Sequence, residues 1–130
     1  FIHDALSGSP VRVPGDGTAM GSYLYLADLA IWLWTILLRD SASSVFNVGS
    51  DEAFSLRTVG ERVAALGPHR VPLVQTGCSA SDAADHAAMP DIARARRELG
   101  LEVWTRFESA VRKTLHHYAA IYQSAETVAA

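Results

Sequence analysis

Apolar residues gather in several stretches at helical spacing, and short apolar runs bounded by turn residues lie between them. In the most apolar stretch, residues 29–38, every position except Thr35 is apolar. Such a stretch is typical of a helix that is buried on most of its sides. Trp32 and Trp34 point to different faces of this helix, so we expect one of them to meet a partner lobe or subunit. A membrane span needs about 20 apolar residues, so this stretch is too short to cross a bilayer.

Four predicted helices begin at a residue whose side chain can accept the free amide protons of a first turn. These caps are Asp28 for a helix to about residue 39, Ser55 for residues 56–66, Asp91 for residues 92–99, and Thr105 with Glu108 for the last helix. A fragment of a fifth helix opens the chain and ends at Gly8. Because that fragment starts at Phe1 without an initiator methionine, we expect a domain that is cut at its amino-terminal edge.

Short apolar runs between turn residues predict strands over residues 10–13, 22–25, 45–48 and 70–75. Residues 76–88 show no period and predict a loop, and the small, polar residues 123–130 predict a frayed tail. Strands and helices do not alternate as they do in a free-standing parallel sheet. The pattern therefore predicts a small α/β lobe, dominated by helices with several short strands, that forms one domain over residues 1–122.

Charge and cysteine content narrow the function classes. The net charge is −3, and the basic residues are scattered apart from Arg94, Arg96 and Arg97, so a nucleic-acid surface has little support. The single cysteine, Cys78, allows no internal disulfide and fits a reducing compartment, so we expect a cytoplasmic protein. Four histidines lack the spacing to carboxylates or cysteines that a metal site requires: His3, His69, His116 and His117.

Three glycines, Gly15, Gly17 and Gly21, stand in a pattern close to that of a dinucleotide-binding loop. That loop needs a helix to begin within its glycines, so that the amino terminus of the helix can hold the pyrophosphate. Here the glycines lead into residues 22–25, which favour a strand. We therefore expect a hairpin-like turn at this position and no cofactor bound by this chain.

Four motifs follow one another in a characteristic order: residues 15–30, residues 46–50 (Phe-Asn-Val-Gly-Ser), residues 89–91 (Met-Pro-Asp) and residues 98–101 (Glu-Leu-Gly-Leu). Together they resemble the carboxy-terminal half of an extended short-chain dehydrogenase/reductase, in the NAD-dependent epimerase/dehydratase family that includes dTDP-glucose 4,6-dehydratase. The resemblance implies the substrate-binding part of a Rossmann-type enzyme. It also implies that NAD or NADP is bound by an amino-terminal Rossmann lobe, which this chain lacks.

The same resemblance implies contacts to a nucleoside-diphosphate sugar. In the family an arginine clamps the diphosphate through bidentate, charge-assisted bonds, and its position here is Gly21. The family's asparagine matches Asn47, whose amide is expected to donate to a phosphate or ribose oxygen, with a purely structural role at the turn as the alternative. A family tyrosine corresponds to Ala88. The backbone of Val11 and Val13 is the remaining expected contact.

The family's catalytic pair, a tyrosine four residues before a lysine, is missing from this chain. Lys113 is the only lysine, and Ser109 stands four residues before it. Without a phenol beside an ammonium group, the chain alone has no general base for oxidising a sugar hydroxyl. We therefore expect a lobe that binds the nucleotide sugar in a sugar epimerase or 4,6-dehydratase. The alternative is a non-catalytic remnant or interaction domain that has lost nucleotide binding, and a homodimer remains open in both cases.

Overall fold

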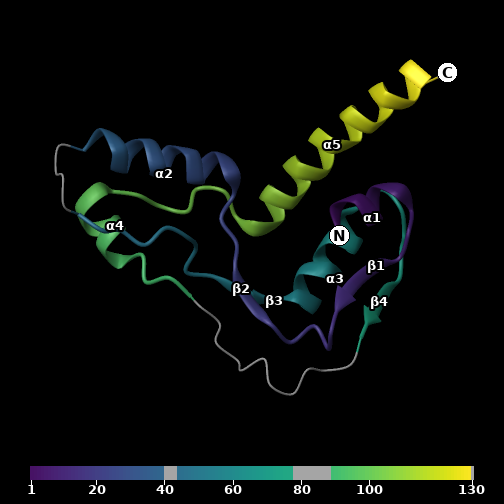
Figure 1. The fold of residues 1–130 in the computed structure, drawn as a ribbon, viewed down its shortest axis with the longest axis horizontal. Helices are drawn as coiled ribbons and strands as arrows, with labels where there is room; N and C mark the ends of the chain where they lie inside the picture. Colours follow the sequence, from purple (N-terminus) through teal and green to yellow (C-terminus); the bar gives the residue numbers. More distant parts are fainter. Residues whose placement is uncertain (40–43, 78–88, 130) are drawn as a thin grey trace. The chain divides into compact units, whose positions relative to one another are not determined.

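The computed structural model describes residues 1–39, 44–77 and 89–129, with side chains described as far as Tyr122. In chain order the elements are α1 (Ile2–Ser7), β1 (Val11–Pro14), β2 (Met20–Ser22), α2 (Leu26–Leu38), β3 (Ala53–Ser55), α3 (Leu56–Leu66), β4 (Leu73–Thr76), α4 (Ala93–Leu99) and α5 (Phe107–Ala129) (Figure 1). Two compact units divide the chain. Unit 1 comprises Phe1–Ala19, Ser55–Ala84 and Glu108–Ala130, and unit 2 comprises Met20–Phe54 and Asp85–Phe107.

Unit 1 is built on a parallel pair of strands, in which Val11 of β1 lies opposite Leu73 of β4. The side chains of Val11 and Val13 are fully buried. Helix α3 packs on this pair at Gly60, where an added Cβ would lie 2.9 Å from Val13 and 2.8 Å from Leu73. Glycine is therefore required for the close approach of the helix to the strands. The strands predicted over residues 10–13 and 70–75 are confirmed as β1 and β4.

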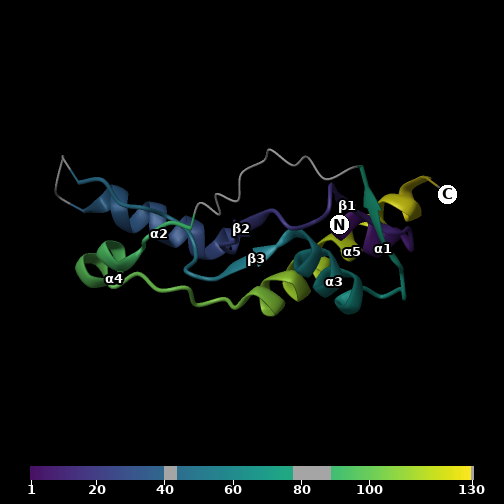
Figure 2. The ribbon, with the colours of Figure 1, turned by 90° about the horizontal axis from the view of Figure 1, so that it is seen from below.

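Unit 2 has its core between α2 and α4, which lie side by side in both views (Figures 1 and 2). Trp32 of α2 is fully buried against Ile92, Ala95 and Leu101. Its indole Nε1 donates a 3.0 Å hydrogen bond to the carbonyl oxygen of Glu102. A buried indole N–H needs such a partner, so this bond fixes the segment after α4 against α2.

The strands of unit 2 differ from the prediction. The ladder covers Met20–Ser22 rather than residues 22–25, because its partner is a short strand, Ala53–Ser55, that the pattern did not predict. Residues 45–48 form no ladder. Side chains hold this segment instead: the Arg94 guanidinium donates to the Val45 carbonyl over 3.0 Å and lies 4.9 Å from the centre of the Phe46 ring.

The predicted cap at Ser55 is confirmed, and those at Asp91 and Asp28 differ in the structure. The Ser55 hydroxyl accepts the Thr58 amide proton at the start of α3. The Asp91 carboxylate accepts the Ala93 amide proton, but the N-cap of α4 is Ile92, which makes no side-chain capping bond. Helix α2 begins at Leu26, ahead of Asp28, and its N-cap makes no side-chain hydrogen bond. Asp28 is buried and accepts two hydrogen bonds from Thr105, through its amide over 2.7 Å and its hydroxyl over 3.0 Å.

Thr105 and Glu108, the predicted capping box of the last helix, both have other partners. Thr105 donates to Asp28, and the Glu108 carboxylate pairs with Arg62 of α3. Helix α5 extends to Ala129, and the fraying of residues 123–130 stays a prediction. No helix within the described ranges is both long and apolar enough to span a membrane. The fold is a small α/β lobe dominated by helices.

Candidate functional site

Gly21, the position where the sequence predicts a vacated phosphate clamp, lies in β2 beneath the ring of Tyr23. A Cβ at residue 21 would lie 3.2 Å from the Tyr23 hydroxyl oxygen and 3.3 Å from two ring carbons. The Tyr23 ring, which follows the end of β2, therefore covers the side from which a residue-21 side chain would project. The sequence alone missed this contact, because Gly21 lies just outside the strand predicted over residues 22–25.

Aromatic rings continue from this side of β2. The Tyr23 ring meets the Phe107 ring edge-on with centroids 5.8 Å apart, and Phe54 lies against Phe107 with centroids 4.7 Å apart. All three residues belong to unit 2. An edge-on pair such as Tyr23 and Phe107 is attractive beyond the area it buries. The surroundings of Gly21 are therefore apolar and aromatic, without a cation among these rings.

A hollow of about 420 Å³ opens on unit 2 beside the other face of β2. Its described lining consists of Ser22, Leu24, Leu29, Val48, Gly49 and Pro90. None of these six residues carries a charge. Gly49 packs closely here, because a Cβ at this position would lie within 2.5 Å of the Pro90 ring.

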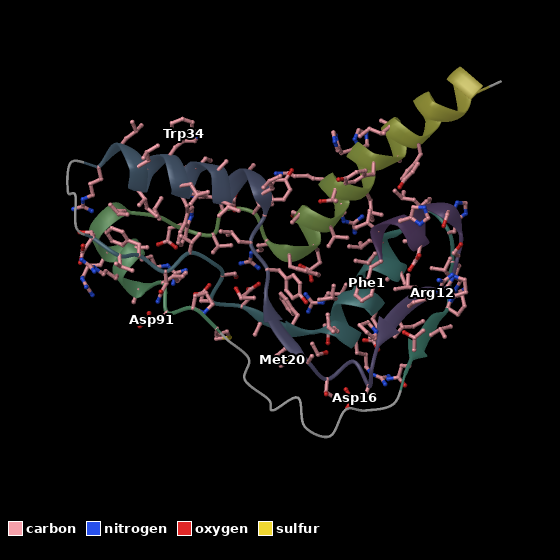
Figure 3. The ribbon with its side chains drawn as sticks, in the orientation of Figure 1. Phe1, Arg12, Asp16, Met20, Trp34 and Asp91 are labelled. Atoms are coloured by element: carbon pink, nitrogen blue, oxygen red, sulfur yellow. The ribbon has the colours of Figure 1, made fainter. Side chains whose placement is uncertain are left out.

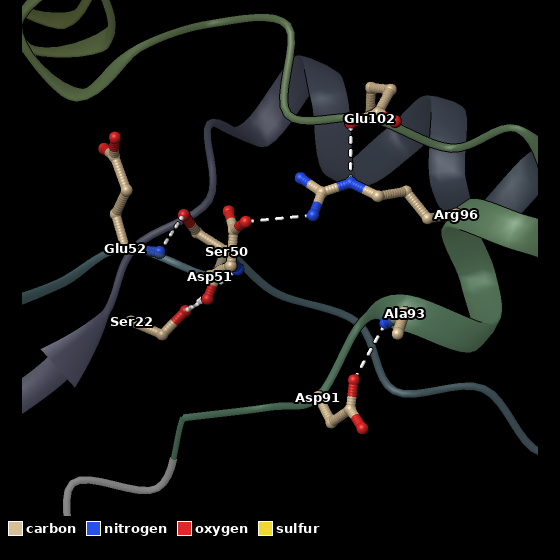
Figure 4. A network of polar contacts seen from close by, with 8 residues as sticks. All are labelled: Ser22, Ser50, Asp51, Glu52, Asp91, Ala93, Arg96 and Glu102. Atoms are coloured by element: carbon tan, nitrogen blue, oxygen red, sulfur yellow. Dashed lines mark hydrogen bonds and ion pairs between the residues drawn. The ribbon is translucent and has the colours of Figure 1, made fainter.

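Ser22 and Ser50 connect the two segments beside this hollow (Figure 4). The Ser22 hydroxyl donates to the Ser50 carbonyl over 2.8 Å and accepts the Ser50 amide proton over 2.9 Å. The Ser50 hydroxyl in turn accepts the Glu52 amide proton over 3.1 Å. Because these bonds satisfy the partly buried groups at the turn, the turn that follows Asn47 is held in one geometry.

Arg96 of α4 joins three parts of unit 2 (Figure 4). Its Nη1 donates to Asp51 over 2.9 Å, and its Nε donates to Glu102 over 2.7 Å. The hydrogen bond from Arg96 lowers the pKa of Asp51 below its ordinary value. The two carboxylates raise the pKa of Arg96, so its charge is already satisfied within unit 2. The sequence singled out this arginine only as part of a basic cluster.

Asn47 is exposed, and its Nδ2 donates a 3.0 Å hydrogen bond to the Asp91 carbonyl oxygen. One amide proton of Asn47 thus ties the turn to the start of α4, which is the structural role the sequence left open. An Asn side chain has a second amide proton and an acceptor oxygen. A contact from Asn47 to a phosphate or ribose oxygen stays a prediction.

The remaining residues expected to contact the nucleotide sugar are Val11, Val13 and Ala88. Val11 and Val13 lie in unit 1, with buried side chains. The Val11 amide donates to the Pro72 carbonyl, and the Thr76 hydroxyl donates to the Val13 carbonyl, so both backbones are already engaged with the neighbouring strand. Ala88 lies outside the described residues. Of the predicted set, Gly21 and Asn47 are both in unit 2.

The glycine loop does not fit a dinucleotide. Gly15 and Gly17 adopt positive φ angles of 63° and 74°, and between them the Asp16 carboxylate accepts the Thr18 amide proton over 2.9 Å. Strand β2 follows this turn, and no helix begins within it. A pyrophosphate would therefore find no helix amino terminus here. Among the residues that the structure describes, no group of three or more metal-ligating side chains occurs.

Curated proteins similar to this chain carry a consistent description, although no protein-family model matches it. The dTDP-glucose 4,6-dehydratase of Neisseria gonorrhoeae is 29% identical over 128 residues, which cover 91% of this chain and 37% of that enzyme. The dTDP-glucose 4,6-dehydratase of Salmonella typhimurium is 27% identical, over 92% of this chain and 35% of that enzyme. Over about nine-tenths of its length the chain is similar to these 4,6-dehydratases, in agreement with its resemblance to extended short-chain dehydrogenase/reductases.

Solved structures share the fold of this chain. A UDP-glucose 4-epimerase of Thermotoga maritima, solved with UDP-glucose, superposes with a TM-score of 0.81 at 18% identity, over 93% of this chain and 38% of that one. An epimerase of Methanothermobacter thermautotrophicus superposes with a TM-score of 0.83 at 19% identity, over 97% of this chain and 38% of that one. The chain thus spans little more than a third of its relatives' length, which is consistent with their carboxy-terminal part.

Proposed function

We propose that this chain is the nucleotide-sugar-binding lobe of an NAD(P)-dependent sugar epimerase or 4,6-dehydratase. It would orient a nucleoside-diphosphate sugar for hydride transfer at a cofactor that an amino-terminal Rossmann lobe holds. Holding the reacting groups in register is how such a lobe contributes to catalysis. The observation that carries the proposal is the match to dTDP-glucose 4,6-dehydratases along nine-tenths of the chain.

The neighbours' ligands support the substrate class. One structural neighbour was solved with UDP-glucose, and a Bordetella bronchiseptica enzyme of the same fold with NAD+ and UDP. These proteins share under 25% identity with this chain, so their ligands are a guide to the class of compound only. The titration below distinguishes the bases.

Recognition of the diphosphate by this lobe would be weak. Gly21 supplies no cation, and the nearby Arg96 is committed to two carboxylates. A charge-assisted hydrogen bond contributes roughly 1.5–3 kcal/mol, so each missing contact lowers affinity about ten- to a hundredfold. Without two of the family's contacts, we expect nucleoside diphosphates to bind in the millimolar range.

The proposal is tested by substituting residue 21 and measuring whether the affinity for nucleoside diphosphates increases. Calorimetric titration of the full chain with dTDP, UDP, CDP and GDP should give at most millimolar affinity. Gly21→Arg should tighten the best of these about ten- to a hundredfold, because a guanidinium would be restored beside the phosphates. Gly21→Gln is the matched control, since it adds a long side chain without charge, and Gly21→Ala measures the cost of displacing the Tyr23 ring.

A tightening that Gly21→Arg shows and Gly21→Gln lacks would support the proposal. Equal affinities for both variants, or no heat with any diphosphate after the arginine is introduced, would contradict it. The second candidate, an interaction domain without nucleotide binding, is favoured by one observation: the apolar exposed face of α2.

A further inference from the structure

The hydroxyl group of Tyr23 in unit 2 has no hydrogen-bond partner among the residues that the structure describes. The Tyr23 side chain is partly buried, and it contacts Phe107 through its ring. Within the described ranges every buried side-chain nitrogen or oxygen atom has a partner, so this hydroxyl oxygen is accessible to solvent. A tyrosine hydroxyl can donate one hydrogen bond and accept others. The group is therefore available to a ligand.

The Tyr23 hydroxyl lies over Gly21 of β2. A Cβ at residue 21 would be 3.2 Å from the hydroxyl oxygen, which is tighter than an ordinary van der Waals contact. Successive residues of a strand point to opposite faces, so residue 21 faces away from Met20, which is labelled at the start of β2 in Figure 3. The hydroxyl thus lies at the root of any side chain that would project from residue 21, and the glycine leaves this place to it.

Ring contacts hold the hydroxyl in this place without using it. The Tyr23 ring meets the Phe107 ring edge-on, and Phe107 is itself buried and lies against Phe54. A phenylalanine at residue 23 would make the same ring contacts, so packing does not account for the hydroxyl. A donor that is already held in place loses little conformational freedom when a ligand binds. These contacts therefore favour a binding role for the hydroxyl.

We propose that the Tyr23 hydroxyl donates a hydrogen bond to a phosphate oxygen of the nucleoside diphosphate, in place of a cation at residue 21. This inference rests on the proposed function, because it assigns a donor to the same ligand. A bond from a hydroxyl to an anionic oxygen is charge-assisted and short, about 2.5–2.7 Å. The phosphate therefore approaches the backbone of β2 more closely than it would at the end of an arginine side chain.

The first experiment removes the hydroxyl and keeps the ring. Binding of dTDP to the full chain is measured by ligand-observed NMR, which suits millimolar affinities. Tyr23→Phe should weaken the binding about tenfold or more, because one hydrogen bond to a charged group is lost. Tyr118→Phe is the matched control, since Tyr118 is an exposed tyrosine of unit 1, and it should bind like the wild type. Circular dichroism would verify that both variants fold.

The second experiment repeats Tyr23→Phe in a chain that carries Gly21→Arg. The arginine side chain has to move the Tyr23 ring aside and supplies its own donor. The two substitutions should therefore be non-additive, with Tyr23→Phe changing the affinity for dTDP by less than about threefold in this background. Added salt should also weaken binding to Gly21→Arg more than binding to the wild type, because it screens an ionic contact.

The outcomes separate this inference from the proposed function. If Tyr23→Phe binds dTDP like the wild type, or loses the same factor in both backgrounds, the inference is overturned and the proposed function stands. The same holds if Gly21→Arg binds a diphosphate that the wild type does not bind. If neither chain binds any of the diphosphates, both proposals fail.

Discussion

Each of the two units of this chain is stabilised internally by a different kind of contact. Unit 1 is organised by a parallel strand ladder and by α3, which packs on it through Gly60. Among its described residues, unit 2 has one short ladder, between β2 and β3. Its segments are joined by side chains that reach distant backbone: Trp32 to Glu102, Asp28 to Thr105, and Asn47 to Asp91. Unit 1 is thus formed by the packing of a helix on paired strands, whereas hydrogen bonds from side chains fix the loops of unit 2.

The difference bears on the predicted site, because two of its predicted positions, Gly21 and Asn47, both lie in unit 2. Turns that are fixed by hydrogen bonds hold polar groups in a set geometry without a strand on either side. A ligand site benefits from that arrangement, since loops carry binding groups while a scaffold positions them. Unit 1 offers few free polar groups along β1 for such a purpose.

The largest expected effect is at the core of unit 2. Trp32→Ala should lower the free energy of unfolding by about 3–5 kcal/mol, because it removes a fully buried indole and leaves a cavity. All three tryptophans of the chain lie in unit 2, so the fluorescence of Trp34 and Trp104 reports on this unit in the variant. The urea midpoint of unfolding, followed by fluorescence, should fall strongly. Trp104→Ala, at a half-exposed position, should shift little, and equal shifts for the two variants would contradict this account.

A smaller effect is expected at the contact between α3 and the strands of unit 1. Gly60→Val should cost about 1–3 kcal/mol, because a side chain there meets Val13 and Leu73 in a packed core. Removing a helical glycine offsets up to ~1 kcal/mol of that cost. Glu61→Val introduces the same residue at the exposed neighbouring position and serves as the control. Thermal unfolding by circular dichroism would measure both, and a Gly60→Val variant as stable as the control would disprove the close approach.

The smallest effect is expected at the ion pair between Arg96 and Asp51 in unit 2. The hydrogen bond from Arg96 lowers the pKa of Asp51 in the folded chain, so the folded state binds a proton less readily than the unfolded state. The stabilisation is therefore complete above the ordinary carboxyl pKa of 3.8 and is lost as the pH falls through the lowered value. Asp51→Asn should reduce the urea midpoint slightly at pH 7 and not at pH 2. Both groups are partly exposed, so the change should be smaller than at either core. A loss that is the same at both pH values would refute the pairing.

The sequence predicted unit 1 better than unit 2, for physical reasons. Strands β1 and β4 and the Ser55 cap follow from local patterns, because apolar runs and a serine before a helix act within a few residues. Asp28 misled the prediction, since an aspartate near a helix start looks like a cap, whereas this one is buried against Thr105, 77 residues further along the chain. Strand β3 was missed because its three residues carry no pattern of their own.

The sequence indicated positions for the candidate site, but not the contacts that the side chains around these positions make. The family resemblance placed Gly21 and Asn47, and it is confirmed by the comparisons. It gave no sign that the Tyr23 ring covers residue 21, or that Asn47 already donates to Asp91. Both contacts depend on how side chains turn after the backbone is placed, and residue spacing does not determine that.

The composition of unit 1 has a consequence for how the chain folds during synthesis. Its three stretches come from the beginning, middle and end of the sequence, and β1 must wait for β4, about sixty residues later, before it can pair. Such long-range pairing is slow because a large loop must close first. All of unit 2 is synthesised before the last stretch of unit 1. Unit 1 therefore cannot be complete before unit 2 has been made, and its strand Val11–Pro14 has to be kept from other partners until then.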